Sequence, residues 1–161
     1  MKKLLTILFV IAIIAGIIML WPVISTTQQN DAAPSSIQSG VVINEVMTSN
    51  KGIYSGDNGS SSDWVEIYNT TDQIVDLSQF GLSDNESKPN KWRFPRVKLA
   101  PYGYIVVFLS GDSKSDEDKG IIHSSIKLSS QGETLLLSDI AGKTVDAVEI
   151  PALSKNVSYG R

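Results

Sequence analysis

Hydrophobic residues along this chain form one long continuous run near the N-terminus and many short runs after residue 40. The long run, LLTILFVIAIIAGIIMLWPVI at 4–24, carries no charge, and its only polar side chain is Thr6. About 20 apolar residues in a helix span roughly 30 Å, the thickness of the hydrocarbon core of a bilayer. Because the run has no polar face, it predicts a transmembrane helix and not a helix buried in a soluble domain.

The charges beside this run predict its orientation. Lys2 and Lys3 precede it, and no further Lys or Arg occurs before Lys51. The positive-inside rule then places residues 1–3 in the cytoplasm and the chain from about residue 25 onward outside. We expect an uncleaved signal anchor, because the run is longer than the apolar region of about 7–15 residues in a cleavable signal. Cleavage followed by secretion is the alternative.

The anchor is followed by a change in composition. Residues 25–40, STTQQNDAAPSSIQSG, contain almost no large apolar groups and predict a flexible stalk. Residues 41–161 then suffice for one domain of about 120 residues. The chain has no Cys, so this domain must be stabilised by its core without disulfides. The formal net charge of −3 argues against broad affinity for nucleic acid.

After the stalk, short runs of β-branched and aromatic residues alternate with clusters of turn residues, and none shows a sustained helical period. This pattern is typical of a β-sandwich or barrel. We expect strands at 41–48, 63–69, 74–77, 80–82, 91–94, 104–109, 122–128, 133–138 and 144–150. The run at 104–109, YIVVFL, is apolar throughout and predicts a strand buried on both faces. The core candidates are Ile43, Trp64 or Val65, Ile67, Leu82, Trp92, Phe94, Ile105, Val107, Leu135, Leu137 and Val148.

Several sequence blocks occur in the order of a known family. They are VVINEVM at 41–47, DWVEIYN at 63–69, VDLSQFGLSDN at 75–85, KWRFP at 91–95, LAPYGYIVVF at 99–108, HSSIKLSSQGETLLLSD at 123–139 and VDAVEIP at 145–151. Over nearly all of 41–160, the chain resembles the lamin-tail domain family in its bacterial surface-protein form. The resemblance implies an all-β, immunoglobulin-like β-sandwich that serves as an interaction module, with no catalytic residues.

The resemblance also leaves an alternative function open. In bacteria, domains of this family occur beside spore-coat-type kinases, nucleases and other hydrolases on exported proteins. Many such relatives continue past a segment like NVSYGR at 156–161 through a stretch with a Thr-Pro-Gly turn, so we expect an incomplete C-terminal strand. In the alternative, the chain is the N-terminal targeting part of a longer exported enzyme truncated at Arg161.

Two acidic clusters have a possible binding chemistry. Glu45, Asp63 and Glu66 lie on two expected strands, and acids on one face of a sandwich can bind a cation or a sugar. We favour a simpler role, in which Glu45 and Glu66 hydrogen-bond the loop at 49–62, because paired acids without a cleft do not make a glycosidase. The stretch DSKSDED at 112–118 lacks the ligand spacing of an EF-hand calcium loop.

One basic cluster is a candidate site for an anionic ligand. Its members are Lys88, Lys91, Arg93, Arg96 and Lys98, around Trp92 and Phe94. Basic and aromatic residues together can bind single-stranded nucleic acid or an anionic wall polymer. We favour strand alternation as the simpler explanation, with the two aromatic rings in the core and the cations pointing outward.

Fragments of enzyme motifs do not combine into an active site. Residues 83–85 and 124–127 resemble parts of penicillin-binding enzymes but occur in the wrong order, and 142–144 lacks the first glycine of a P-loop. His123 is the only histidine, and we expect it to be exposed or to form hydrogen bonds at the edge of the core. The sequence therefore predicts a single-pass cell-membrane protein that catalyses nothing. Its expected partners are the membrane and an unknown surface protein or wall polymer, without a metal or cofactor.

Overall fold

The computed structural model describes residues 40–54, 61–115 and 120–161. The expected cytoplasmic segment at 1–3, the anchor at 4–24 and all of the stalk except Gly40 lie outside these residues. Within the described ranges, no helix has the length and apolar character needed to cross a membrane.

The described residues form short and medium-length strands and one 3₁₀-helix. The elements are β1 (Val41–Met47), β2 (Asp63–Asn69), β3 (Val75–Asp76), η1 (Leu77–Gln79), β4 (Phe80–Ser83), β5 (Trp92–Arg93), β6 (Lys98–Leu99), β7 (Tyr104–Leu109), β8 (Ile122–His123), β9 (Glu133–Asp139), β10 (Thr144–Ile150) and β11 (Tyr159–Gly160). The expected strands at 63–69, 104–109 and 144–150 have these same ends. The strand expected at 122–128 ends at His123, although Ile126 and Leu128 beyond it are buried.

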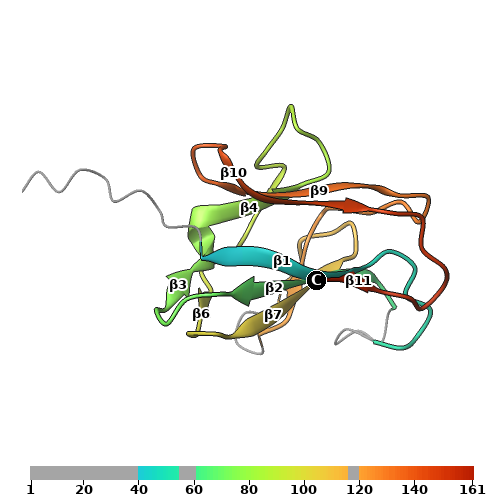
Figure 1. Ribbon diagram of the computed structural model, residues 1–161, viewed down its shortest axis with the longest axis horizontal. Helices are drawn as coiled ribbons and strands as arrows, with labels where there is room; N and C mark the ends of the chain where they lie inside the picture. The colour runs from blue at the N-terminus through green and yellow to red at the C-terminus, as the bar shows by residue number, and fades with distance from the viewer. Residues whose placement is uncertain (1–39, 55–60, 116–119) are drawn as a thin grey trace, which may run out of the picture. The chain divides into compact units, whose positions relative to one another are not determined.

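Two sheets pack face to face in this part of the chain. One has the strand order β11–β1–β2–β7–β8 and the other the order β10–β9–β4–β5, while β3 and β6 form a separate pair. Figure 1 shows β4, β9 and β10 in one layer and β1, β2 and β7 in the other. Among the described strands, only β7 and β8 pair in parallel. The all-β class is thus confirmed, and the two layers agree with an immunoglobulin-like β-sandwich.

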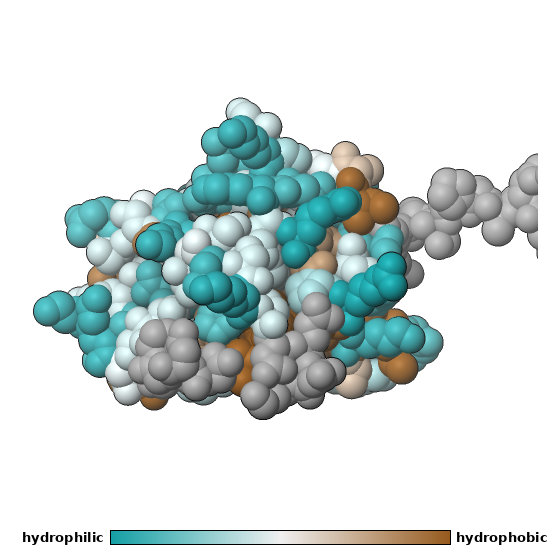
Figure 2. All heavy atoms as spheres, turned by 180° about the vertical axis from the view of Figure 1, so that it is seen from behind, coloured by the Kyte–Doolittle hydropathy of each residue, from teal (hydrophilic) through white to brown (hydrophobic). Residues whose placement is uncertain are grey.

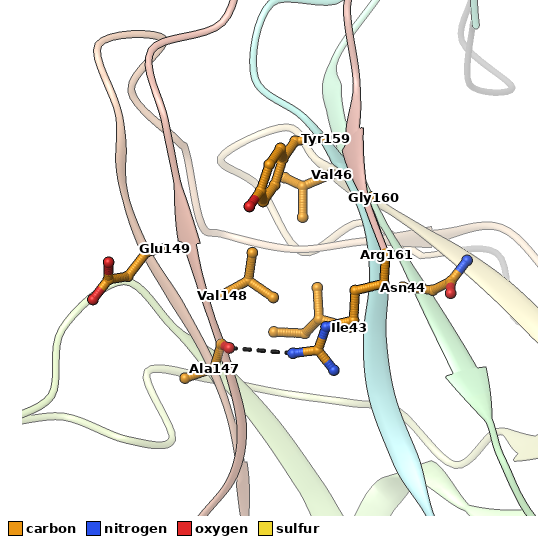
Figure 3. A pocket seen from close by; sticks show the side chains of 9 residues that line it. All are labelled: Ile43, Asn44, Val46, Ala147, Val148, Glu149, Tyr159, Gly160 and Arg161. Atoms are coloured by element: carbon orange, nitrogen blue, oxygen red, sulfur yellow. Dashed lines mark hydrogen bonds between the residues drawn. The ribbon is translucent and has the colours of Figure 1, made fainter.

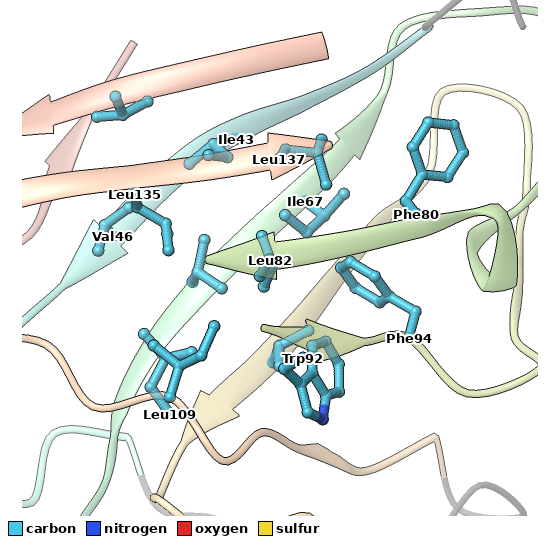
Figure 4. Close-up of a cluster of buried hydrophobic side chains, with 14 of the residues drawn as sticks. Ile43, Val46, Ile67, Phe80, Leu82, Trp92, Phe94, Leu109, Leu135 and Leu137 are labelled. Atoms are coloured by element: carbon cyan, nitrogen blue, oxygen red, sulfur yellow. The ribbon is translucent and has the colours of Figure 1, made fainter. Parts of the chain in front are cut away.

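Side-chain alternation along the strands builds the core between the layers. In β2, Val65 and Ile67 are fully buried and point toward the opposite sheet, as Figure 4 shows for Ile67. Trp92 and Phe94 join them from the edge of the other sheet, with ring centroids 4.8 Å apart. Full burial of one such side chain contributes about 1.5–3 kcal/mol. Of the expected core residues, Ile105 is only partly buried.

The outer face of the five-stranded sheet is not uniformly polar. Tyr104, at the start of β7, exposes 55% of its surface, so the prediction that this strand is buried on both faces was wrong. Met47 and Phe108 are nevertheless buried, and they lie outside the core cluster between the sheets. This second group of sheltered apolar residues therefore belongs to the outer face.

A buried amide fixes the turn between β2 and β3. Asn69 has no exposed surface, and its Nδ2 donates to the carbonyl oxygens of Gln73 at 2.7 Å and Ala100 at 2.9 Å. Its Oδ1 accepts from the backbone N–H of Thr71 at 3.0 Å and from the hydroxyl of Thr71 at 2.7 Å. Both ends of one side chain thus hold two separate loops against the end of β2.

Candidate functional site

A crevice lies between the edges of the two sheets, where β10 faces β1 and β11. Its volume is about 190 Å³, and the side chains in Figure 3 line it. Asp146 of β10 accepts from the backbone N–H of Ile43 at 2.7 Å and from Nη2 of Arg161 at 2.7 Å. The same Nη2 donates to the carbonyl of Ala147 at 3.3 Å, the bond drawn in Figure 3. These bonds join the two sheets, so we assign the crevice a structural role.

A larger hollow lies on the outer face of the five-stranded sheet. It encloses about 520 Å³, within the range typical of ligand pockets. We call it the outer-face hollow, and it is lined by Glu45, Met47, Ile53, Tyr54, Trp64, Glu66, Val106, Asn156 and Ser158. Its floor comes from β1, β2 and β7, and its walls come from the segments after β1 and before β11.

Strand register places two carboxylates opposite each other in this hollow. Past the β-bulge between Ile43 and Glu45, Glu45 of β1 faces Glu66 of β2, and Glu66 faces Val106 of β7. The cross-strand rows on either side of these acids are mostly aromatic: Met47, Trp64 and Phe108 on one side, and Tyr68 and Tyr104 on the other. The outer face of the sheet thus presents a band of negative charge between two rows of rings, of which the row with Trp64 lines the hollow.

The rings of the outer face contact one another. Tyr54 packs edge-on against Trp64, with centroids 6.1 Å apart, and stacks on Phe108 at 5.5 Å. On the other side of the acids, Tyr68 and Tyr104 stack at 4.3 Å. Such pairs stabilise a fixed arrangement by about 0.5–1.5 kcal/mol beyond the area they bury. The walls of the hollow are therefore preformed, while Tyr54 still exposes 45% of its surface.

Two asparagines hold the wall that carries Tyr54. Asn50 is 1% exposed, and its Oδ1 accepts from the backbone N–H groups of Ile53 at 3.2 Å and Tyr54 at 3.3 Å. Asn156 approaches from the segment before β11, and its Oδ1 accepts from the backbone N–H of Lys51 at 2.6 Å. These hydrogen bonds hold the backbone of this wall at Lys51, Ile53 and Tyr54.

The three acids predicted as a group have separate environments. Asp63 accepts from the backbone N–H of Asn50 at 3.3 Å; burial raises the pKa of Asp63, and that bond and Lys51 oppose the rise. Glu66 instead accepts from Nδ2 of Asn44 at 2.7 Å. The carboxylate of Glu45 makes no hydrogen bond or ion pair in the part of the chain that the structure describes. Within the same residues, the prediction that Glu45 and Glu66 bond the loop was therefore wrong.

One tyrosine in the row beside the acids has a raised pKa. The pKa of Tyr104 lies above its ordinary value of 10.0, first because the neighbouring protein atoms partly desolvate the phenol. The neighbouring Tyr68 and the carboxylate of Glu66 raise that pKa further. Because an anion disfavours formation of a second anion, Glu66 adds to the rise, but its contribution is the smallest of these causes.

The basic cluster is exposed but partly neutralised by acids. Lys88, Lys91, Arg93, Arg96 and Lys98 are all exposed, while Trp92 and Phe94 are buried. The alternation that we favoured is thus present. Nζ of Lys91 lies 2.7 Å from both carboxylate oxygens of Asp84. The loop after β4 that carries Lys88 projects from its sheet at the top of Figure 1, and the projecting part at the top of Figure 2 is largely hydrophilic.

Two further cations of the cluster act on a single acid. The pKa of Asp76 is lowered, first by the hydroxyl and backbone N–H of Ser78, with smaller contributions from Lys98 and Arg96. Three of the five cations therefore have acidic neighbours. An anionic-ligand site at this cluster remains a prediction, and the simpler structural explanation remains the one we favour.

His123 lies at the edge of the core. It is 3% exposed, its backbone N–H donates to the hydroxyl of Ser115 at 3.0 Å, and its Nδ1 lies 3.1 Å from the hydroxyl of Ser110. The ring also stacks on Phe108 at 5.3 Å. In the described ranges, no three His, Asp or Glu side chains come together as a metal site would require.

Sequence reasoning missed the outer-face hollow because it assigned aromatic residues to the core. A signal was present in DWVEIYN, where strict alternation places Trp64, Glu66 and Tyr68 on one face and Val65 and Ile67 on the other. The contribution of Tyr54 had no such signal, because a loop position has no fixed period.

The two packed sheets define an all-β domain with an immunoglobulin-like β-sandwich fold. The chain belongs to the Lamin Tail Domain family, whose family model matches residues 34–152. The resemblance noted in the sequence is thus confirmed at the level of the family. None of the curated proteins matches the chain. The family is not one of known catalytic domains.

Proposed function

We propose that this chain is a membrane-anchored interaction module, whose domain at 41–161 lies outside the cytoplasm and binds a cell-surface or extracellular partner without catalysis. The apolar, uncharged run at 4–24, preceded by Lys2 and Lys3, supports the anchor and its orientation. The stalk at 25–40 separates the domain from the bilayer surface by a flexible linker.

The outer-face hollow is the observation that supports binding most directly. A monomeric domain gains no stability from two carboxylates placed opposite each other in a sheet, because like charges in register repel. Glu45 and Glu66 are in this arrangement, and Ile53 beside them exposes 65% of its surface. Exposed apolar and aromatic side chains that gather around a hollow are typical of a surface that contacts another molecule.

Protease treatment of intact cells tests the anchor and the orientation of the domain in this proposal. We expect the chain in the membrane fraction, and we expect external protease to digest the domain without cell lysis, because the domain is on the outer side. A cytoplasmic membrane-associated protein serves as the control for cell integrity. Protection of residues 41–161 in intact cells would contradict the orientation, and recovery of the domain only from the medium would favour cleavage and secretion.

A further inference from the structure

We propose that the outer-face hollow binds a lysine or arginine side chain of an extended, basic segment in a protein partner. This inference rests on the proposed function and adds the chemistry of the partner. The residues that carry it are Glu45, Glu66 and Trp64 on the floor and Tyr54 on one wall.

Charge complementarity argues for a cationic ligand. Glu45 and Glu66 are directly opposite each other, and no ion pair joins either acid to a cation in the described part of the chain. Opposed Cβ atoms in a sheet lie about 4.5–5.5 Å apart, so a single ammonium or guanidinium group can contact both carboxylates. A ligand cation thus converts a repulsive pair into two attractive contacts.

The aromatic rows favour the same ligand. The face of a tryptophan or tyrosine ring attracts a cation within about 6 Å of its centre. Trp64 lies in the row directly beside the acids and lines the hollow together with Tyr54, while Tyr68 and Tyr104 bound the acids on the other side. A cation held by the carboxylates therefore has aromatic rings next to it.

The dimensions and charge of the hollow favour a protein segment over a polymer of the cell wall. A volume of about 520 Å³ accommodates one long side chain together with part of its backbone. The exposed apolar groups of Ile53 and Tyr54 can cover the methylene stem that lysine and arginine share. An anionic polymer would meet two like charges here, and this repulsion argues against it.

Titration calorimetry with decalysine tests the inference on the full chain in detergent. We expect the E45Q/E66Q double variant to weaken decalysine binding at least ten-fold, because glutamine keeps the shape of glutamate and removes the charge. The E86Q/E149Q variant is the matched control: it makes the same change in net charge at two exposed positions outside the hollow, and we expect less than a two-fold loss.

Three outcomes would overturn the inference. Equal losses in the two double variants would show attraction to the net charge of the chain and not to the hollow. Equal binding of fully acetylated decalysine would show that the cation is not recognised. Binding of a neutral oligosaccharide that depends on Glu45 and Glu66 would identify a sugar site instead. Protease shaving can fail while decalysine still binds, and the reverse also holds, so this test and that of the proposed function are independent.

Discussion

At the scale of single residues, the buried side chain of Asn69 uses both its amide nitrogen and its amide oxygen in hydrogen bonds. The carbonyls of Gln73 and Ala100, and the N–H and hydroxyl of Thr71, all meet this one side chain. An unsatisfied buried polar group costs about 1–3 kcal/mol. We therefore regard Asn69 as the residue whose identity matters most for the turn between β2 and β3.

The replacement Asn69→Ala is expected to lower the free energy of unfolding by about 1–3 kcal/mol, because the backbone N–H of Thr71 loses its acceptor and the carbonyls of Gln73 and Ala100 each lose one donor. Asn85→Ala is the matched control, since Asn85 is exposed and its Oδ1 accepts from the backbone N–H of Ser87. Urea unfolding of both variants measures the difference. A loss at Asn69 no larger than that at Asn85 would show that water can replace these bonds.

At the scale of elements, the 3₁₀-helix η1 depends on an acidic cap. Oδ1 of Asp76 accepts from the backbone N–H of Ser78 at 3.0 Å and from its hydroxyl at 2.7 Å. Both bonds favour the ionised carboxylate, and they hold the pKa of Asp76 below its ordinary value of 3.8. The resulting stabilisation is present above pH 3.8 and is lost as the pH falls through the lowered pKa of the folded state.

We expect Asp76→Ala to destabilise the domain by about 1 kcal/mol, the usual cost of losing a cap residue. Asp76→Asn keeps the acceptor oxygen and removes the charge, so its loss should be smaller and should depend on pH. Thermal unfolding of the chain and the Asp76→Asn variant at pH 7 and at pH 3 measures this dependence. A stability difference that stays constant or grows toward pH 3 would contradict the contribution of the charge.

Strands are predictable where alternation and β-branched residues extend over several positions, as at 63–69 and 144–150. The two-residue strands β6 and β11 were missed because their pairing depends on distant partners and not on a local period. The expected strand at 122–128 was too long, since buried Ile126 and Leu128 alternate like a strand without pairing as one.

The candidate site was less predictable than the fold. The sequence indicated that the strands containing Glu45 and Glu66 can pair, but the facing of these two acids depends on the bulge between Ile43 and Glu45. A bulge changes the register by one residue, and the single asparagine at this position, Asn44, is too weak a signal to predict it. The position of Tyr54 depends in turn on the bonds of Asn50, which form only in the folded loop.

At the scale of the whole molecule, one acid connects the two sheets. Asp146 of β10 accepts from the backbone N–H of Ile43 in β1 and forms an ion pair with Arg161 at 2.7 Å. We expect Asp146→Ala to destabilise the domain by about 2 kcal/mol, because the buried N–H of Ile43 then has no acceptor.

The Arg161→Ala variant separates the two contributions of Asp146. The Arg161 side chain is 49% exposed, and an ion pair of this kind contributes about 0–1 kcal/mol. Chemical unfolding should therefore show a clearly smaller loss for Arg161→Ala than for Asp146→Ala. Similar losses in both variants would mean that the ion pair, and not the bond to Ile43, carries the connection between the sheets.

The placement of the tryptophans has an optical consequence. Trp92 is 7% exposed inside the sandwich, whereas Trp64 lines the outer-face hollow. The chain has three tryptophans, so replacing Trp21 by Phe leaves these two as its intrinsic fluorophores. A molecule that enters the hollow should change the emission of Trp64 alone, while unfolding should change that of both. One spectrum can thus distinguish occupancy of the surface from loss of the core.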